Sequence, residues 1–198
     1  MDVDDYYMNH VFLSELWLWK HMLDNIDVNV SDRWKKQLSD EKRHAAMTKG
    51  ALRKSLKFKG LSLELINNNT QFSLEKALYQ DLGGIDVDAI SDKDFSPFVY
   101  VVERRASLLF KYYLKFGSNE YYKKVTKKII QDETDHLDIH RSLAEKNPYY
   151  ETFNLIDRKI YARLSEVYSG GTTPFFNKIE FWHDMFNYNL KDKVGVIR

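Results

Sequence analysis

Helix breakers are scarce in this chain, and their scarcity restricts the folds that it can adopt. Three prolines and eight glycines interrupt 198 residues, and the stretches between them mix leucine, lysine, glutamate and aromatic residues. Such stretches favour a few long helices over many short strands. With 43% hydrophobic residues, a chain of this length can form one compact domain with a substantial core. We therefore predict a single all-α domain over residues 1–198.

Capping and turn residues divide the chain into segments. We predict five long helices, over residues 8–26, 33–54, 98–116, 120–145 and 150–168, and a shorter one over 174–188. Asp32 is expected to cap the second helix, and Ser96 and Pro97 are expected to open the third. Residues 55–96 contain clustered asparagine, glycine and aspartate. They predict a long connection with one short helix near residues 73–81.

The predicted helices form two closely spaced pairs that are separated by one long connection. This order predicts an up-down four-helix bundle with one long crossover, whose core spans about residues 8–145. One or two further helices are expected to form a C-terminal extension over about residues 149–190.

An internal repeat lies within the predicted bundle. Residues 40–44 read DEKRH and residues 132–136 read DETDH, so the pattern DExxH occurs twice. A predicted helix precedes each copy and carries one glutamate in an otherwise apolar stripe, which is Glu15 before the first copy and Glu103 before the second. Helix residues three apart lie one turn apart on one face, so the Glu and the His of each motif can point to one site.

The repeat predicts a metal site in the core. Glu133 and His136 share a helix face with apolar residues such as Ile129, whereas Lys124 and Lys128 point away. Four carboxylates in a low-dielectric interior each cost on the order of several kcal/mol unless protons or cations compensate them. Mixed carboxylate and imidazole donors suit two iron or manganese ions. The predicted metal ligands are Glu15, Glu41, His44, Glu103, Glu133 and His136.

On these residues, over about residues 8–145, the chain resembles the ferritin-like di-iron carboxylate superfamily. The resemblance implies two iron ions, with a Mn/Fe pair left open, and O2 as co-substrate. It assigns three roles to the six ligands: single carboxylates at Glu15 and Glu103, bridging carboxylates at Glu41 and Glu133, and imidazoles at His44 and His136. In relatives with DExxH the Asp often supports a ligand histidine, so Asp40 and Asp132 are expected to orient His136 and His44.

The absence of cysteine separates branches of this superfamily. It excludes the cysteine-rich module of rubrerythrins, together with disulfides and thiolate metal sites. The residues after the fourth predicted helix and the long connection favour the oxygenase and oxidase branch over ferritins. We expect an O2-dependent di-iron monooxygenase or oxidase that acts on a small organic substrate, by hydroxylation, N-oxygenation or a related oxidation. An external electron donor is expected, because no reductase segment is recognised.

Small side chains beside the ligands indicate where a substrate would bind. Four small residues lie one turn after predicted ligands, where a sealed core favours leucine or isoleucine: Ala45, Thr48, Ala106 and Ser107. They predict a pocket for O2 and substrate, with ordinary close helix packing as the alternative. His140 lies one turn beyond His136 and is expected to be a hydrogen-bonded core histidine beside the site, with an extra iron ligand as the alternative.

Two other functions explain parts of the pattern. Iron oxidation and storage in a ferritin-like shell would use the same ligands but predicts a very large assembly, whereas an oxygenase is expected to be a monomer or homodimer. A metal-free helical adaptor is the third possibility. The acidic first residues and short apolar runs predict neither a secretion signal nor a membrane span, so a cytoplasmic protein without a membrane partner is expected. A net charge of +1 gives no overall attraction to nucleic acid.

Overall fold

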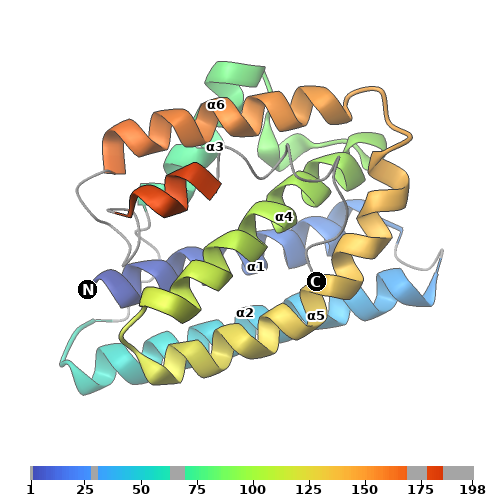
Figure 1. Ribbon diagram of the computed structural model, residues 1–198. Helices are drawn as coiled ribbons and strands as arrows, with labels where there is room; N and C mark the ends of the chain where they lie inside the picture. The colour runs from blue at the N-terminus through green and yellow to red at the C-terminus, as the bar shows by residue number, and fades with distance from the viewer. Residues whose placement is uncertain (1, 28–30, 63–69, 169–177, 185–198) are drawn as a thin grey trace.

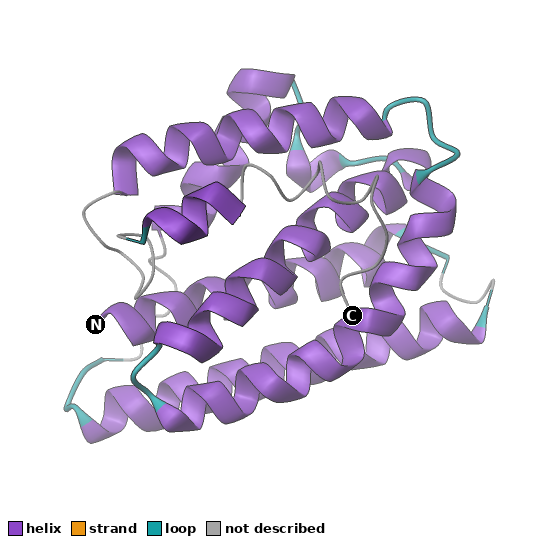
Figure 2. Ribbon diagram, viewed as in Figure 1, coloured by secondary structure: helices purple, strands orange, loops and turns teal. Residues whose placement is uncertain are grey.

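The structure is a computed structural model that describes residues 2–27, 31–62, 70–168 and 178–184. Within these residues all regular secondary structure is helical, which confirms the all-α class (Figure 2). The elements are α1 (Val3–Asn25), α2 (Asp32–Phe58), α3 (Thr70–Gly83), the 3-10 turn η3 (Val87–Ala89), α4 (Asp92–Phe116), α5 (Glu120–Ala144) and α6 (Tyr150–Tyr168).

The helices form two long antiparallel pairs. Helix α1 packs along α2, α4 packs along α5, and the pairs meet where α2 contacts α5 (Figure 1). Helices α1 and α4 face each other through the stacked rings of Tyr7 and Tyr113, whose centroids are 3.8 Å apart. Helices α3 and α6 contact each other, and they lie against α1 and α4 respectively, on the side away from α2 and α5 (Figure 1).

The start of α2 differs by one residue from the predicted start. Ser31 caps the helix, because its hydroxyl oxygen accepts a hydrogen bond from the backbone N–H of Trp34 at 3.2 Å. Asp32, the predicted cap, is instead the first helical residue and is exposed. Both residue types are good caps, and the one whose hydroxyl reaches a free backbone N–H takes the position.

Helix α4 begins at Asp92 rather than at Phe98, so the prediction that Ser96 and Pro97 open this helix is wrong. Pro97 lies inside the helix and has no N–H to donate to the carbonyl oxygen of Lys93, one turn earlier. The side-chain amide of Asn147 donates to that oxygen instead, at 2.8 Å. A contact from a distant part of the chain thus compensates for the proline.

The connection between α2 and α4 contains more helix than predicted, since α3 spans Thr70–Gly83 rather than residues 73–81. Gly83 permits close contact with α6, because a Cβ atom there would lie 2.6 Å from Cδ1 of Ile156. Gly84 has a φ of 64° and ends the helix. Of the helix predicted over residues 174–188, residues 179–184 are helical and the remainder lies outside the described residues, apart from residue 178.

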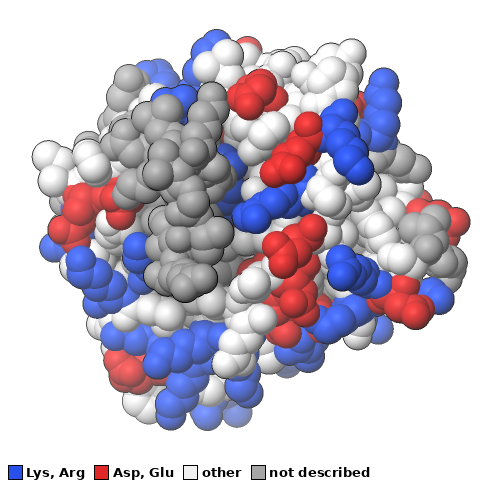
Figure 3. Space-filling model, turned by 45° about the vertical axis from the view of Figure 1, so that its right-hand side comes forward, with Lys and Arg blue, Asp and Glu red and all other residues white. Residues whose placement is uncertain are grey.

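No helix among the described residues is both long enough and apolar enough to cross a membrane. On the face seen in Figure 3, basic and acidic side chains alternate with uncharged ones, so neither sign of charge covers it. Most of the core is apolar and aromatic. Charged side chains are also buried, most densely in the middle of the two helix pairs.

Candidate metal centre

Six buried side chains from four helices meet in the middle of the two helix pairs. Each of the six is at most 7% exposed. Helices α1 and α4 contribute one glutamate each, whereas α2 and α5 each contribute a glutamate and a histidine three residues apart, which therefore share a helix face. The structure thus brings together all six residues that the sequence predicted as ligands, which are Glu15, Glu41, His44, Glu103, Glu133 and His136.

The six residues form two overlapping groups. In the first, Glu15, Glu41, His44 and Glu133 each place one possible ligand atom within 4.8 Å of the others. In the second, Glu41 does the same with Glu103 and His136. Because Glu41 belongs to both groups, the arrangement has the form of two adjacent metal sites that share a carboxylate.

The oxygens of Glu41 and Glu133 lie between the two histidines. One oxygen of Glu41 is 3.8 Å from Nδ1 of His44, and the other is 3.0 Å from Nδ1 of His136. Glu133 divides its oxygens in the same way, at 3.5 Å from each Nδ1 atom. Each carboxylate therefore presents one oxygen to each half of the site, as a bridging ligand would.

The two remaining glutamates each belong to one half of the site. An oxygen of Glu15 lies 3.3 Å from Nδ1 of His44, and an oxygen of Glu103 lies 3.9 Å from Nδ1 of His136. Each half therefore contains one histidine, one glutamate of its own and two shared carboxylates.

The outer nitrogens of the histidines contact the aspartates of the opposite motif. Nε2 of His44 lies 3.1 Å from Asp132, and Nε2 of His136 lies 3.5 Å from Asp40. A carboxylate at Nε2 keeps a proton on that nitrogen and leaves Nδ1 facing the site. One guanidinium joins the two aspartates, because Arg43 donates to Asp40 at 2.7 Å and to Asp132 at 2.9 Å.

Without metal, the six residues hold protons as well as charge. Burial and the charge of Glu41 raise the pKa of Glu15, and burial and the charge of Glu133 raise the pKa of Glu103. Burial also raises the pKa of Glu133. Glu41 behaves in the opposite way, because the facing imidazoles of His136 and His44 outweigh burial and lower its pKa.

The two histidines are strong bases in this environment. Burial alone would lower their pKa values, but neighbouring carboxylates more than reverse this effect. Contacts with the carboxylates of Glu15 and Glu41, and their charges, raise the pKa of His44 to about 11. Those with Glu133 and Glu41 raise the pKa of His136 to about 12. The metal-free cluster therefore contains two imidazolium ions at neutral pH.

His140 lies beside the cluster but belongs to neither ligand group. Its Nε2 contacts the side-chain amide of Gln37, and burial together with the charge of His136 lowers the pKa of His140 to about 3. Gln37 also donates to Glu103 at 3.0 Å. Gln37 is not among the residues predicted from the sequence, although a polar residue four positions before Glu41 on the same buried helix face is a usable signal.

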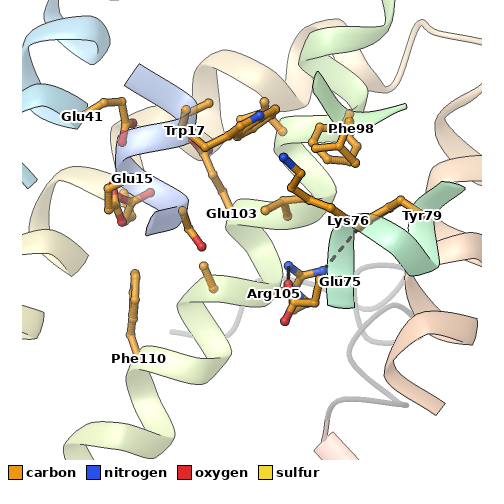
Figure 4. Close-up of a pocket in the computed structure, with 17 residues that line it drawn as sticks. Glu15, Trp17, Glu41, Glu75, Lys76, Tyr79, Phe98, Glu103, Arg105 and Phe110 are labelled. Atoms are coloured by element: carbon orange, nitrogen blue, oxygen red, sulfur yellow. Dashed lines mark hydrogen bonds and ion pairs between the residues drawn. The ribbon is translucent and has the colours of Figure 1, made fainter. Parts of the chain in front are cut away.

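A cavity of about 70 Å³ reaches the cluster from between α1, α3 and α4 (Figure 4). The carboxylates of Glu15, Glu41, Glu103 and Glu133 contribute to its wall, and the rest of the wall is mainly apolar. The cavity thus connects the candidate metal centre with a space in which a small molecule could bind.

The cavity coincides only in part with the predicted pocket, since Ala106 lines it whereas Ala45, Thr48 and Ser107 do not. Thr48 donates its hydroxyl to the backbone oxygen of His44 at 2.8 Å, and Ser107 donates to that of Glu103 at 3.1 Å. Ala45 is buried. At these three positions the contacts match the alternative, ordinary helix packing, because the two hydroxyls are satisfied within their own helices and the alanine permits close packing.

Comparisons of the chain with protein-family models, with curated proteins and with solved structures find no match. Whether the residues suit a metal pair is therefore judged from the site itself. Three buried atoms of the cluster make no hydrogen bond within the described residues: Glu103 Oε2, and the pair Glu41 Oε1 and His136 Nδ1, which lie 3.0 Å apart without hydrogen-bond geometry. Buried polar atoms usually have a partner. Metal ions in the two groups would supply one to each of these atoms, so the residues suit a metal pair.

Proposed function

We propose that this chain is a ferritin-like di-iron carboxylate protein that uses O2 to oxidise a small organic substrate. In this proposal α1, α2, α4 and α5 are the four helices of the bundle, and the segment containing α3 is its long crossover. The observation that carries the proposal is the division of the oxygens of Glu41 and Glu133 between His44 and His136. That geometry is expected of two bridging carboxylates, whose place between the histidines is held by imidazolium ion pairs when metal is absent.

Each residue of the cluster has a separate task in this proposal. Glu15 and His44 would hold one ion, and Glu103 and His136 would hold the other. Glu41 and Glu133 would join the two ions. Four carboxylates balance the charge of two divalent ions, which removes the cost of burying the carboxylates alone. The ligand types suit iron, and they also suit a Mn/Fe pair.

The surroundings of the cluster support oxidation of a small molecule. An iron pair, when bound, would supply the redox chemistry with O2. The apolar wall of the cavity would exclude water and hold a substrate next to the carboxylates. Asp40 and Asp132 would keep Nδ1 of each histidine directed at the ions. Electrons would come from an external donor or from the substrate.

The proposal is tested by loading the metal-free protein with Fe(II) without oxygen and then adding O2. We expect about two irons per chain, consumption of O2 and the absorption of ferric iron. Glu133→Ala should abolish these results, whereas Glu151→Ala, which changes an exposed glutamate on α6, should not. Iron binding below about one per chain, or no consumption of O2, would contradict the proposal.

Gel filtration separates this function from iron storage. A storage shell elutes as a very large assembly, whereas the proposed enzyme should elute as a monomer or homodimer. Elution as a shell, with O2 consumption that deposits iron, would favour the storage function instead.

A further inference from the structure

The cavity beside the candidate metal centre has a cationic group in its wall. Figure 4 shows Glu15 and Glu41 on one side of the cavity and Lys76 of α3 on the other. The space between them is enclosed by apolar side chains, which are Leu18, Phe98, Val99, Val102, Ala106 and Phe110. A molecule that fills the cavity would therefore meet apolar surface along its length and a positive charge at the end away from the cluster.

A carboxylate of the chain itself already occupies the position next to this cation. Nζ of Lys76 lies 2.5 Å from one oxygen of Asp88, and the indole N–H of Trp17 donates to the other oxygen at 3.0 Å. Lys76 and Trp17 both line the cavity, whereas Asp88 belongs to the short turn η3. An ammonium and an indole N–H placed in this way form a carboxylate-binding pair.

This carboxylate can be replaced more easily than the others near the cavity. The side chains of Lys76 and Asp88 are 31% and 56% exposed, and ion pairs of this kind contribute little to stability. Arg105 also lines the cavity, but it is buried and contacts Glu75 at 3.1 Å and Asp157 at 2.5 Å. Breaking those contacts would leave buried charges unpaired, which is costly. Lys76 is therefore better placed than Arg105 to bind an incoming anion.

The volume of the cavity limits the apolar part of its occupant. The cavity measures about 70 Å³, which is about half of the roughly 150 Å³ cavity that holds benzene in another protein. An aromatic ring would require the walls to move. A chain of about three or four carbon atoms matches the space without such movement.

We propose that the cavity binds a short aliphatic carboxylate, with its carbon chain against the apolar wall and its carboxylate at Lys76 and Trp17. Asp88 then gives up its contacts and turns to solvent. This inference rests on the proposed function for its purpose, since it names the substrate class of the same site. Its evidence is independent of the metal, because Lys76, Trp17 and Asp88 are not among the candidate ligands.

Binding of butyrate and of butyramide to the metal-free protein tests the inference. Calorimetric titration should show that butyrate binds roughly tenfold or more tightly than butyramide, because a charge-assisted contact is lost in the amide. Lys76→Met should remove this preference, and Asp88→Asn should increase the affinity for butyrate by removing the competing carboxylate. Lys115→Met is the matched control, since it breaks a similar exposed ion pair, with Glu180, outside the cavity.

Equal affinity for butyrate and butyramide, binding of neither, or a preference that persists in Lys76→Met would overturn the inference. Weaker binding of benzoate than of butyrate would support the size argument, and stronger binding would contradict it. The titration needs no metal, so its failure is distinguishable from failure of the proposed function. Iron-dependent O2 consumption without carboxylate binding would contradict the substrate class alone.

Discussion

The guanidinium of Arg43 contacts both aspartates of the DExxH motifs, and Lys36 also donates to Asp40 at 3.1 Å. Because each aspartate supports a different histidine, Arg43→Gln should weaken both metal sites together. Loss of such supporting contacts typically reduces metal affinity by roughly 10- to 100-fold. Competition titration with a chelator would measure the effect. Arg53→Gln, an exposed change on the same helix, should leave the affinity unchanged, and loss of only one metal would contradict the shared role of Arg43.

Protons should compete with metal for His44 and His136. Their pKa values in the metal-free protein are raised to about 11 and about 12, so both imidazoles are protonated at neutral pH and must lose a proton to bind metal. Metal affinity should therefore increase with pH between about 6 and 8, by up to roughly tenfold per pH unit for each proton released. Calorimetry in buffers of different ionisation enthalpy counts these protons, and affinity that does not change with pH would contradict the prediction.

At the level of the helix, Asn147 compensates for Pro97. Asn147→Ala should destabilise the protein by about 1 kcal/mol, because the backbone oxygen of Lys93 then loses its hydrogen bond. The same change should cost less when residue 97 is alanine, whose N–H can donate to that oxygen. Denaturant unfolding of the single and double variants measures this coupling. Equal costs in both backgrounds would show that the two residues are independent.

The sequence predicted which helices exist, and which buried Glu and His side chains meet, better than it predicted where helices start. Apolar spacing identified α1, α2, α4, α5 and α6, and the spacing of Glu and His on α2 and α5 placed both motifs on buried faces. Pro97 was misplaced because the residue that compensates for it, Asn147, is distant in the sequence. Local rules for the start of a helix do not include such partners.

The pocket was predicted only in part, at Ala106, for a similar reason. The side chains of Thr48 and Ser107 are satisfied by their own helices, and this is not visible from residue size alone. The cavity exists because α3 lies beside α1 and α4 and brings Lys76 and Tyr79 to its wall. The packing of a helix within a long connection depends on contacts that carry no local motif.

For the whole molecule, metal binding and folding should be coupled. The cluster joins all four helices of the two pairs, so ions held there bind the folded chain and not the unfolded one. A metal at about 100 times its dissociation constant adds roughly 2.7 kcal/mol, which for a domain of this size raises the Tm by roughly 5–10 °C. Thermal unfolding with Mn(II) and with a chelator would measure this. An unchanged Tm would indicate that the cluster binds no metal in the folded state.

Asp40 contacts His136 and Asp132 contacts His44, so each half of the chain supports the histidine of the other half. Each half carries an intact DExxH sequence, yet the aspartate that steadies its imidazole belongs to the other half. If the chain were cut between α2 and α4, each fragment would keep one DExxH motif but would lack the aspartate that contacts its histidine. A substitution of the aspartate in one motif would therefore also weaken metal binding at the candidate site of the other motif. Its effect would cross the interface between α2 and α5.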